Sequence, residues 1–255
     1  MEEQCLLPSC RRHPKSIVVV SSNDHQVVIS SKVALKVSWE SSTESVRNEC
    51  KMLQRLEEHH VTGVEQCLAM DTYPGTVTKT YNTQQQQQRA MIVLQPVMED
   101  TASLVNSIGL IPSNELQQQA TQQVIRTMLQ MLAAQVATTD VQPLISATTG
   151  HVLFIDMTEA QIIAREPSSL ELALCRSFVS EMMVLIPEKM TTVAAQAMEQ
   201  ELVIMSSRYS QQQQQPQQQI SDNGTLPILD RIPLSIRDIL KDQVPFLTQT
   251  SLAIL

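Results

Sequence analysis

Glycine and aromatic residues are scarce in this sequence of 255 residues. It holds 5 glycines, and since the first of them is Gly63, no glycine-rich loop precedes that position. Tryptophan, tyrosine and phenylalanine together make up 3% of the chain. No apolar run approaches the roughly 18 residues that a membrane-spanning helix needs. We therefore expect no spanning segment, and no glycine-lined phosphate site before Gly63.

Positive charge is also in short supply, with 18 lysines and arginines against 26 acidic residues and a net charge of -8. Proteins that bind the nucleic-acid backbone usually present a basic face, so we expect no nucleic-acid partner. The five cysteines form an odd, scattered set, namely Cys5, Cys10, Cys50, Cys67 and Cys175. This pattern is typical of reduced thiols in an intracellular protein, cytoplasmic or nuclear, rather than of a disulfide framework or a metal site.

Two aspartates stand near the ends of short predicted strands in the stretch 138–160. Asp140 precedes Val-Gln-Pro, Asp156 follows the apolar run 152–155, and a polar turn at Gly150 joins the two. One carboxylate that orients a hydroxyl, with a second that holds a divalent cation, is a division of labour used in phosphoryl transfer. The alternative is a β-hairpin whose aspartates are ordinary turn residues, which is the commoner meaning of an isolated pair.

The N-terminal part of the chain is predicted to be rich in strands. Residues 1–15 lack the features of a secretory signal and are expected to form a disordered tail. The runs 17–20 and 27–29 predict a hairpin. In the next strand, 32–38, alternation puts Ala34 and Lys36 on one face.

A helix is expected directly afterwards, because Ser41 and Glu44 have the spacing of a capping box. Glu49 lies at the margin of its apolar stripe, which consists of Val46, Cys50, Leu53 and Leu56. Two further strands are expected around 63–70 and 90–95. The tract Gln84–Gln88 between them is expected to be a solvent-exposed loop.

The second half of the chain is predicted to be mainly helical. Apolar periodicity indicates helices over 116–136, 168–186 and 191–205. The tract Gln211–Gln219 has the composition of a flexible spacer. After it, Pro233 is expected to open a short amphipathic helix with the apolar residues Ile236, Ile239 and Leu240, which packs back on its own domain.

The order of these features resembles the protein-kinase-like fold over roughly residues 16 to 205. Val33-Ala34-Leu35-Lys36 resembles the kinase strand whose lysine grips the α and β phosphates and whose alanine lies over adenine. Glu49 resembles the helix glutamate that pairs with this lysine. Asp140-Val-Gln-Pro resembles the catalytic loop, and Asp156-Met-Thr stands in the place of Asp-Phe-Gly, whose aspartate binds magnesium.

The resemblance implies an α+β fold in two lobes, with a small antiparallel sheet and one helix in the first and an abbreviated, mainly helical second lobe. The implied boundaries are 16–98 for the first lobe, with a Gln-rich loop at 84–88, 99–205 for the second, 206–225 for a Gln-rich linker and 226–255 for a C-terminal docking segment. ATP and Mg²⁺ are the implied cofactors. The implied site consists of Asp140, Lys36 and Glu49 in catalysis, Asp156 at the metal, and Ala34, Lys36, Gln95, Val97 and Asp100 around the nucleotide.

Several positions depart from the kinase pattern. The turn Ser21–His25 has no glycine and carries a carboxylate, so it would hold phosphates poorly. Ile145 stands where the pattern has an asparagine that binds the second magnesium, and an aliphatic side chain cannot coordinate a hard cation. Ser146 is a neighbouring candidate for that role. The short gap after Asp156 leaves no room for an activation segment, a compactness similar to that of the RIO kinases.

Two interpretations follow from this mixture of retained and lost residues. The first is a pseudokinase-like binding or regulatory module that docks a protein partner and binds ATP through degenerate motifs. The alternative is an active, atypical ATP-dependent phosphotransferase. A third possibility is a scaffold whose glutamine tracts make multivalent contacts. For Lys36 and Glu49, the simpler alternative to a nucleotide-facing pair is an exposed surface pair, worth at most about 1 kcal/mol.

Overall fold

The computed structural model describes residues 18–21, 25–29, 33–38, 43–80, 83–95, 103–212 and 229–255. These residues form a mixed α+β structure with small antiparallel sheets and several helices, which confirms the expected fold class at this level. The chain divides into two compact units. The first unit comprises residues 1–54 and 65–99, and the second comprises 55–64 and 100–255.

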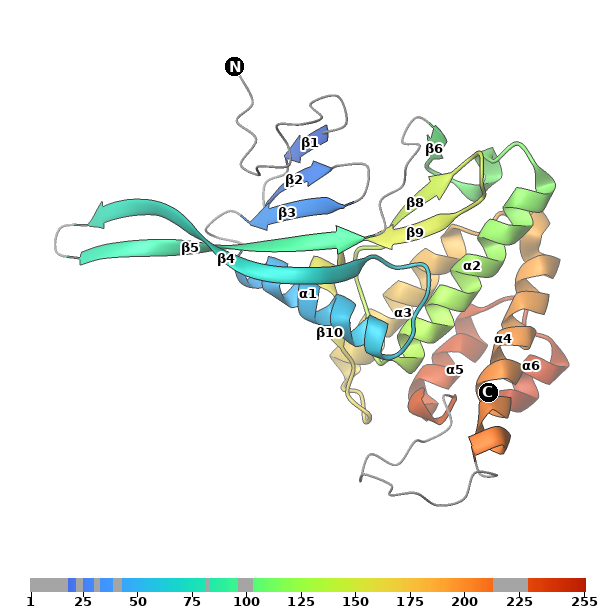
Figure 1. Ribbon diagram of the computed structural model, residues 1–255. Coiled ribbons are helices and arrows are strands. Elements are labelled where there is room, and N and C mark those ends of the chain that lie inside the picture. The colour runs from blue at the N-terminus through green and yellow to red at the C-terminus, as the bar shows by residue number, and fades with distance from the viewer. Residues whose placement is uncertain are drawn as a thin grey trace. The chain divides into compact units, whose positions relative to one another are not determined.

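The first unit contains a five-stranded antiparallel sheet in the order β1-β2-β3-β5-β4 (Figure 1). Its strands are β1 (Val18–Ser21), β2 (His25–Ile29), β3 (Ala34–Ser38), β4 (Gln66–Thr80) and β5 (Thr83–Gln95). The predicted first hairpin is confirmed, because Val18 pairs with Ile29 and Ser21 pairs with Gln26. The turn between these strands includes residues 22–24, which lie outside the described part of the chain.

Helix α1 (Thr43–Glu58) follows β3 and begins two residues after the predicted cap, Ser41, which is not among the described residues. Its predicted apolar stripe is confirmed, since all four side chains are fully buried, namely Val46, Cys50, Leu53 and Leu56. Burial of this stripe removes apolar surface from water and is the main driving force that holds the helix.

The glutamine tract Gln84–Gln88 lies within β5, so the prediction of a loop there is wrong. The backbone of the tract pairs with β4 in the register Gln84↔Lys79, Gln85↔Thr78, Gln86↔Val77 and Gln88↔Pro74. Ladder hydrogen bonds join backbone groups, so a polar tract can continue an antiparallel pair that apolar residues have started. The composition of the tract therefore did not reveal its conformation.

The second unit is built around α2 (Asn114–Ala133), which packs against α3 (Ser169–Val184) and α4 (Thr191–Gln212). The N-cap of α2 is Ser113, whose hydroxyl accepts a hydrogen bond from the Leu116 backbone. The predicted core face of the helix is confirmed, with Ala120, Val124, Met128, Leu129 and Leu132 at most 1% exposed. Two shorter helices complete the unit, α5 (Leu234–Gln243) and α6 (Gln249–Ile254).

Two small sheets accompany these helices. One has the order β6-β8-β9 and consists of Leu104–Val105, Gln142–Ser146 and Val152–Ile155. The other pairs β10 (Gln161–Ile162) with β7 (Val136–Ala137). The predicted hairpin around Gly150 is confirmed by the pairing of Ile145 with Val152. Gly150 has φ +66, and a Cβ there would lie 2.7 Å from the Leu116 carbonyl oxygen, so only glycine fits this turn.

The C-terminal part differs from the prediction at one boundary. Helix α4 continues to Gln212, so a linker that starts at residue 206 is wrong by several residues. Glutamine is a good helix former, and each residue added to an existing helix gains a hydrogen bond, so the helix runs into the tract. After residues 213–228, which are not described, Pro233 precedes α5 as predicted, and this helix packs against α3. Within the described ranges, no helix is long and apolar enough to cross a bilayer.

Candidate functional site

An ion pair between Lys36 and Glu49 lies in the core of the first unit. Lys36 is on β3 and Glu49 is on α1, and their Nζ and Oε2 atoms are 2.8 Å apart. The side chains are only 3% and 0% exposed. The alternative of an exposed surface pair is therefore wrong.

The local sequence explains how two charged side chains come to lie in this core. Lys36 pairs with Ile92 of β5 on one side and with Val27 of β2 on the other, so it occupies an inner strand. Glu49 precedes Leu53 by about one helical turn and therefore shares the buried face of α1. The sequence predicted Glu49 at the margin of this face, but Glu49 is fully buried.

A disulfide bond joins Cys50 of α1 to Cys67 of β4. The prediction of reduced thiols is therefore wrong for these two residues. Cys50 belongs to the apolar stripe and Cys67 is 5% exposed, and their Cα atoms are 5.2 Å apart, within the usual range for a disulfide. The sequence alone could not show this pairing, because the 17-residue separation does not determine which cysteines meet.

Cys175 of α3 is a free thiol in the described part of the second unit. Burial, together with the nearby Glu171 carboxylate, raises the pKa of Cys175 to about 12. Because the thiolate is the reactive form, this residue is inert at neutral pH. Cys5 and Cys10 lie outside the described residues.

Of the other residues predicted to contact the nucleotide, Ala34 and Gln95 are among the described residues. Ala34 is 5% exposed and lies two positions before Lys36 on β3, so both side chains project from the same face of the sheet. Gln95 is the last residue of β5, where it pairs with Gln66. Val97 and Asp100 lie outside the described residues.

Asp140 lies in the second unit, just before β8, and is exposed. Its Oδ2 atom accepts a hydrogen bond of 2.5 Å from Gln142 Nε2. Its backbone N–H donates to the hydroxyl of the buried Thr138 at 3.2 Å. The carboxylate is thus held by the neutral amide of Gln142.

Asp156 has a left-handed backbone, with φ 59 and ψ 70, at the start of the short 3₁₀ helix 157–159. Its Oδ1 atom accepts a hydrogen bond of 2.6 Å from the Thr158 hydroxyl. A residue other than glycine in this region costs about 1–3 kcal/mol, and such strain clusters at functional sites. The sequence did not reveal this conformation, because aspartate also occurs in right-handed and extended backbone.

The position of the missing asparagine is occupied by a core residue. Ile145 is fully buried on β8 and pairs with Val105 of β6. The hydroxyl of its neighbour Ser146 lies 3.1 Å from that of Thr148 and accepts a hydrogen bond from the Thr149 backbone. Ser146 therefore stabilises the turn of the hairpin, and Ile145 supplies packing in place of a metal ligand.

No family model matches this chain, and no curated protein matches it. Among solved structures, the one titled "Crystal structure of PF14_0431, kinase domain" is similar. The alignment covers 75% of this chain and 70% of that chain, at 11% sequence identity and a TM-score of 0.38. A TM-score this low does not establish a shared fold.

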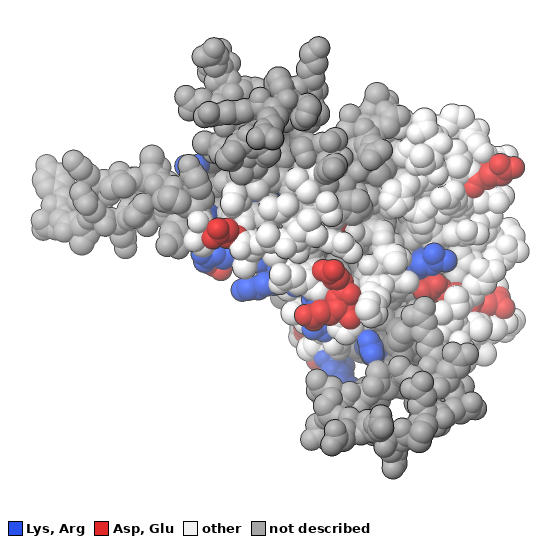
Figure 2. Space-filling view, viewed as in Figure 1, with Lys and Arg blue, Asp and Glu red and all other residues white. Residues whose placement is uncertain are grey.

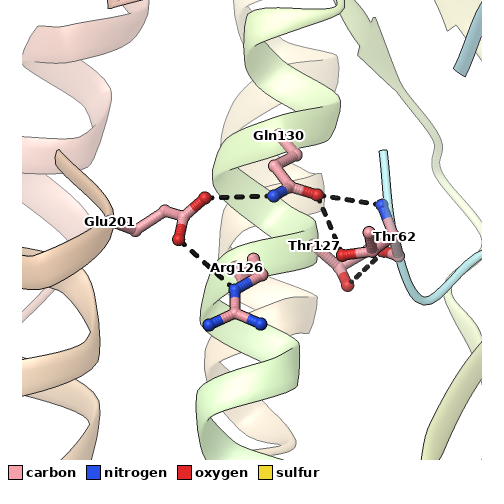
Figure 3. A network of polar contacts seen from close by, with 5 residues as sticks. All are labelled: Thr62, Arg126, Thr127, Gln130 and Glu201. Carbon is pink, nitrogen blue, oxygen red and sulfur yellow. Dashed lines mark hydrogen bonds and ion pairs between the residues drawn. The ribbon is translucent and has the colours of Figure 1, made fainter. Parts of the chain in front are cut away.

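A polar network joins three segments of the second unit (Figure 3). Glu201 of α4 accepts hydrogen bonds from Gln130 at 3.0 Å and from Arg126 at 3.3 Å, both on α2. Gln130 Oε1 in turn accepts from the Thr62 backbone at 2.9 Å, and the Thr127 hydroxyl donates to the Thr62 carbonyl at 2.8 Å. This network could not be predicted from the sequence, because its members are far apart along the chain.

Next to this network is a small surface hollow lined in part by His59, His60, Gln130, Glu201 and Arg231. The Arg231 guanidinium lies 3.2 Å from His59 Nδ1. Burial, followed by the positive charges of Arg55 and Arg231, lowers the pKa of His59. The lowered pKa favours the neutral imidazole, whose Nδ1 accepts a hydrogen bond from Arg231. Among the described residues, no group of three or more His, Cys, Asp and Glu side chains is placed to hold a metal ion.

Proposed function

We propose that this chain is a kinase-like module that binds ATP and has lost efficient phosphoryl transfer. The buried ion pair between Lys36 and Glu49 is the observation that supports the proposal most. Removing two charges from water costs several kcal/mol per ion, and their attraction only partly offsets that cost. A buried pair of this kind is more readily explained by a functional requirement than by a gain in stability.

In the proposed role, the Lys36 ammonium interacts with the α and β phosphates of the nucleotide and Glu49 holds the lysine in place. Ala34 shares the lysine's face of the sheet and would contact the adenine ring, and Gln95 would offer backbone groups to its edge. The sequence resemblance adds Val97 and Asp100 to this set. In this arrangement, the positive charge of Lys36 and nearby backbone groups position the nucleotide and its phosphates.

In the second unit, Asp156 is the proposed Mg²⁺ ligand and Asp140 the proposed partner of an acceptor hydroxyl. The strained backbone of Asp156 supports a functional role for this carboxylate. Two features support weakened catalysis. Ile145 is an apolar core residue where a second metal ligand is expected, and the Asp140 carboxylate is hydrogen-bonded to Gln142.

The proposed module acts by docking a protein partner, in an intracellular setting. A nucleic-acid partner is not favoured, because the net charge is -8. On the face shown in Figure 2, the acidic and basic side chains of the described residues are interspersed, without a continuous basic patch.

The test measures binding and transfer in one experiment with ATP labelled at its γ-phosphate, Mg²⁺ and a generic protein acceptor. We expect the protein to retain the nucleotide and to transfer little phosphate. Efficient transfer that Asp156→Ala abolishes would favour the active phosphotransferase instead. A protein that retains no nucleotide at millimolar ATP would refute both forms of the proposal.

A further inference from the structure

We propose that the Cys50–Cys67 disulfide is a redox-sensitive positioning element that keeps Glu49 on Lys36. Glu49 and Cys50 are consecutive residues of α1. The first makes an ion pair with β3, and the second makes a covalent bond to β4. Two adjacent positions of one helix are thereby attached to two different strands of the same sheet.

Both attachments are on the same face of the sheet. Cys67 pairs directly with Leu94 of β5, and Leu94 pairs directly with Ala34 of β3. Residues that lie directly opposite each other in neighbouring strands project from the same face, and so do residues two apart in one strand. The side chains of Cys67, Ala34 and Lys36 therefore project toward the helix from one face.

The connections form a closed loop through the first unit. From Cys50, the disulfide leads to β4, the strand pairs lead through β5 to β3, and the ion pair leads back from Lys36 to Glu49. A covalent bond next to Glu49 restricts how far its carboxylate can move from the ammonium. Without that bond, the contacts that hold this part of α1 include the apolar stripe and the ion pair, and a buried ion pair contributes little net stability.

The redox step is a thiol–disulfide exchange with an external dithiol. A thiolate of the dithiol attacks one sulfur of the disulfide and forms a mixed disulfide, and the second thiol of the reagent then displaces the protein sulfur. Cys50 and Cys67 each gain one electron and one proton, and the dithiol becomes a disulfide. Because Cys50 and Cys67 are 0% and 5% exposed, the reaction needs a local opening of α1 from the sheet.

Disulfides in reducing compartments are usually redox-sensing or transient, which suits the intracellular setting proposed above.

The test compares how fast an amine-specific acylating reagent labels Lys36 in the oxidised and the reduced full-length protein, with readout by peptide mass spectrometry. Lys51, an exposed residue on the same helix, is the internal control. We expect reduction to raise labelling of Lys36 by about tenfold, because labelling of a buried group follows the population of opened molecules. Labelling of Lys51 should not change, and reoxidation should restore the protection of Lys36.

Two variants separate the positioning role from a merely structural one. Cys50→Ala/Cys67→Ala should reproduce the reduced state without reductant, and Cys175→Ser should respond like the wild type. Unchanged Lys36 protection in reduced protein that keeps its far-UV circular dichroism would overturn the proposal. Loss of helical signal on reduction would also overturn it, because the bond would then hold the whole fold rather than position Glu49.

The consequence for nucleotide binding rests on the proposed function and is measured separately. If both proposals hold, reduction should expose Lys36 and weaken retention of ATP. Exposure of Lys36 in a protein that never binds ATP would refute the proposed function and leave the positioning role intact. Equal ATP retention in both redox states, with Lys36 protected in both, would refute the positioning role and leave the proposed function intact.

Discussion

Lys36 of β3 and Glu49 of α1 form an ion pair of 2.8 Å with both side chains almost completely removed from solvent. Each charge in such a pair depends on the other, because an isolated charge in an apolar interior is strongly unfavourable. This dependence gives the pair a characteristic response to substitution that an exposed pair does not have.

Single substitutions of the pair should be costly, and the double substitution should not. We expect Glu49→Gln or Lys36→Met to lower the free energy of unfolding by about 3–5 kcal/mol, because each removes one charge of a buried ion pair. The double variant Lys36→Met/Glu49→Leu should recover most of that loss, since apolar residues of similar size often replace a buried ion pair without cost. Urea denaturation measures all three values. Losses below 1 kcal/mol in the single variants would contradict the observed burial.

Reduction of the Cys50–Cys67 disulfide should destabilise the protein. The bond joins residues separated by 17 positions. Closing a loop of this size restricts the unfolded chain and contributes about 3 kcal/mol in the chain-entropy model. The free energies of unfolding of the wild type and of Cys50→Ala/Cys67→Ala, each with and without dithiol, measure this contribution. A dithiol effect of equal size in both proteins would show that it does not come from this bond.

The network of Figure 3 should depend on Gln130, which connects Glu201 with Thr62. We expect Gln130→Ala to lower the free energy of unfolding by about 0.5–1.5 kcal/mol, because it removes the hydrogen bonds to Glu201 and Thr62. Gln122→Ala is the matched control, since Gln122 is an exposed glutamine on the same helix. Equal stability of the two variants would refute a structural role for the network.

Stability should fall on mild acidification because of His59. The pKa of His59 in the folded protein is below its ordinary value of 6.5, so the unfolded chain binds the proton more tightly. The free energy of unfolding is therefore highest above pH 6.5 and decreases as the pH falls through 6.5 toward the lowered pKa. His59→Asn should flatten this part of the pH profile. If the free energy of unfolding depended on pH in the same way in the wild type and in His59→Asn, the effect could not be assigned to His59.

Much of the local structure could be predicted from the sequence. Alternation in the segment around Ala34 and Lys36 predicted β3, the four-residue stripe from Val46 predicted α1, and the glycine at 150 predicted the β8–β9 hairpin. These features depend on residues close together in the chain, whose periodicity directly reflects which side faces the core.

The features that the sequence did not reveal depend on long-range partners or on the backbone alone. Cys50 and Cys67 meet only because α1 packs on the sheet, and Glu201 meets Gln130 only because α4 packs on α2. The glutamine tract is part of β5 because its backbone pairs with β4. Its polar side chains do not indicate this pairing. The resemblance to kinases indicated that Lys36 and Glu49 form a pair, but local spacing did not indicate their complete burial.

The central claim is that Lys36 belongs to an ATP-binding site, and a thermal-shift titration with ATP tests it most directly. A ligand that binds only the folded protein must raise its melting temperature. We predict that ATP raises the melting temperature of the wild type and of Lys51→Met, more so with Mg²⁺, and has no effect on the double variant Lys36→Met/Glu49→Leu. No shift of the wild type at saturating ATP, or an equal shift in the double variant, would contradict the claim.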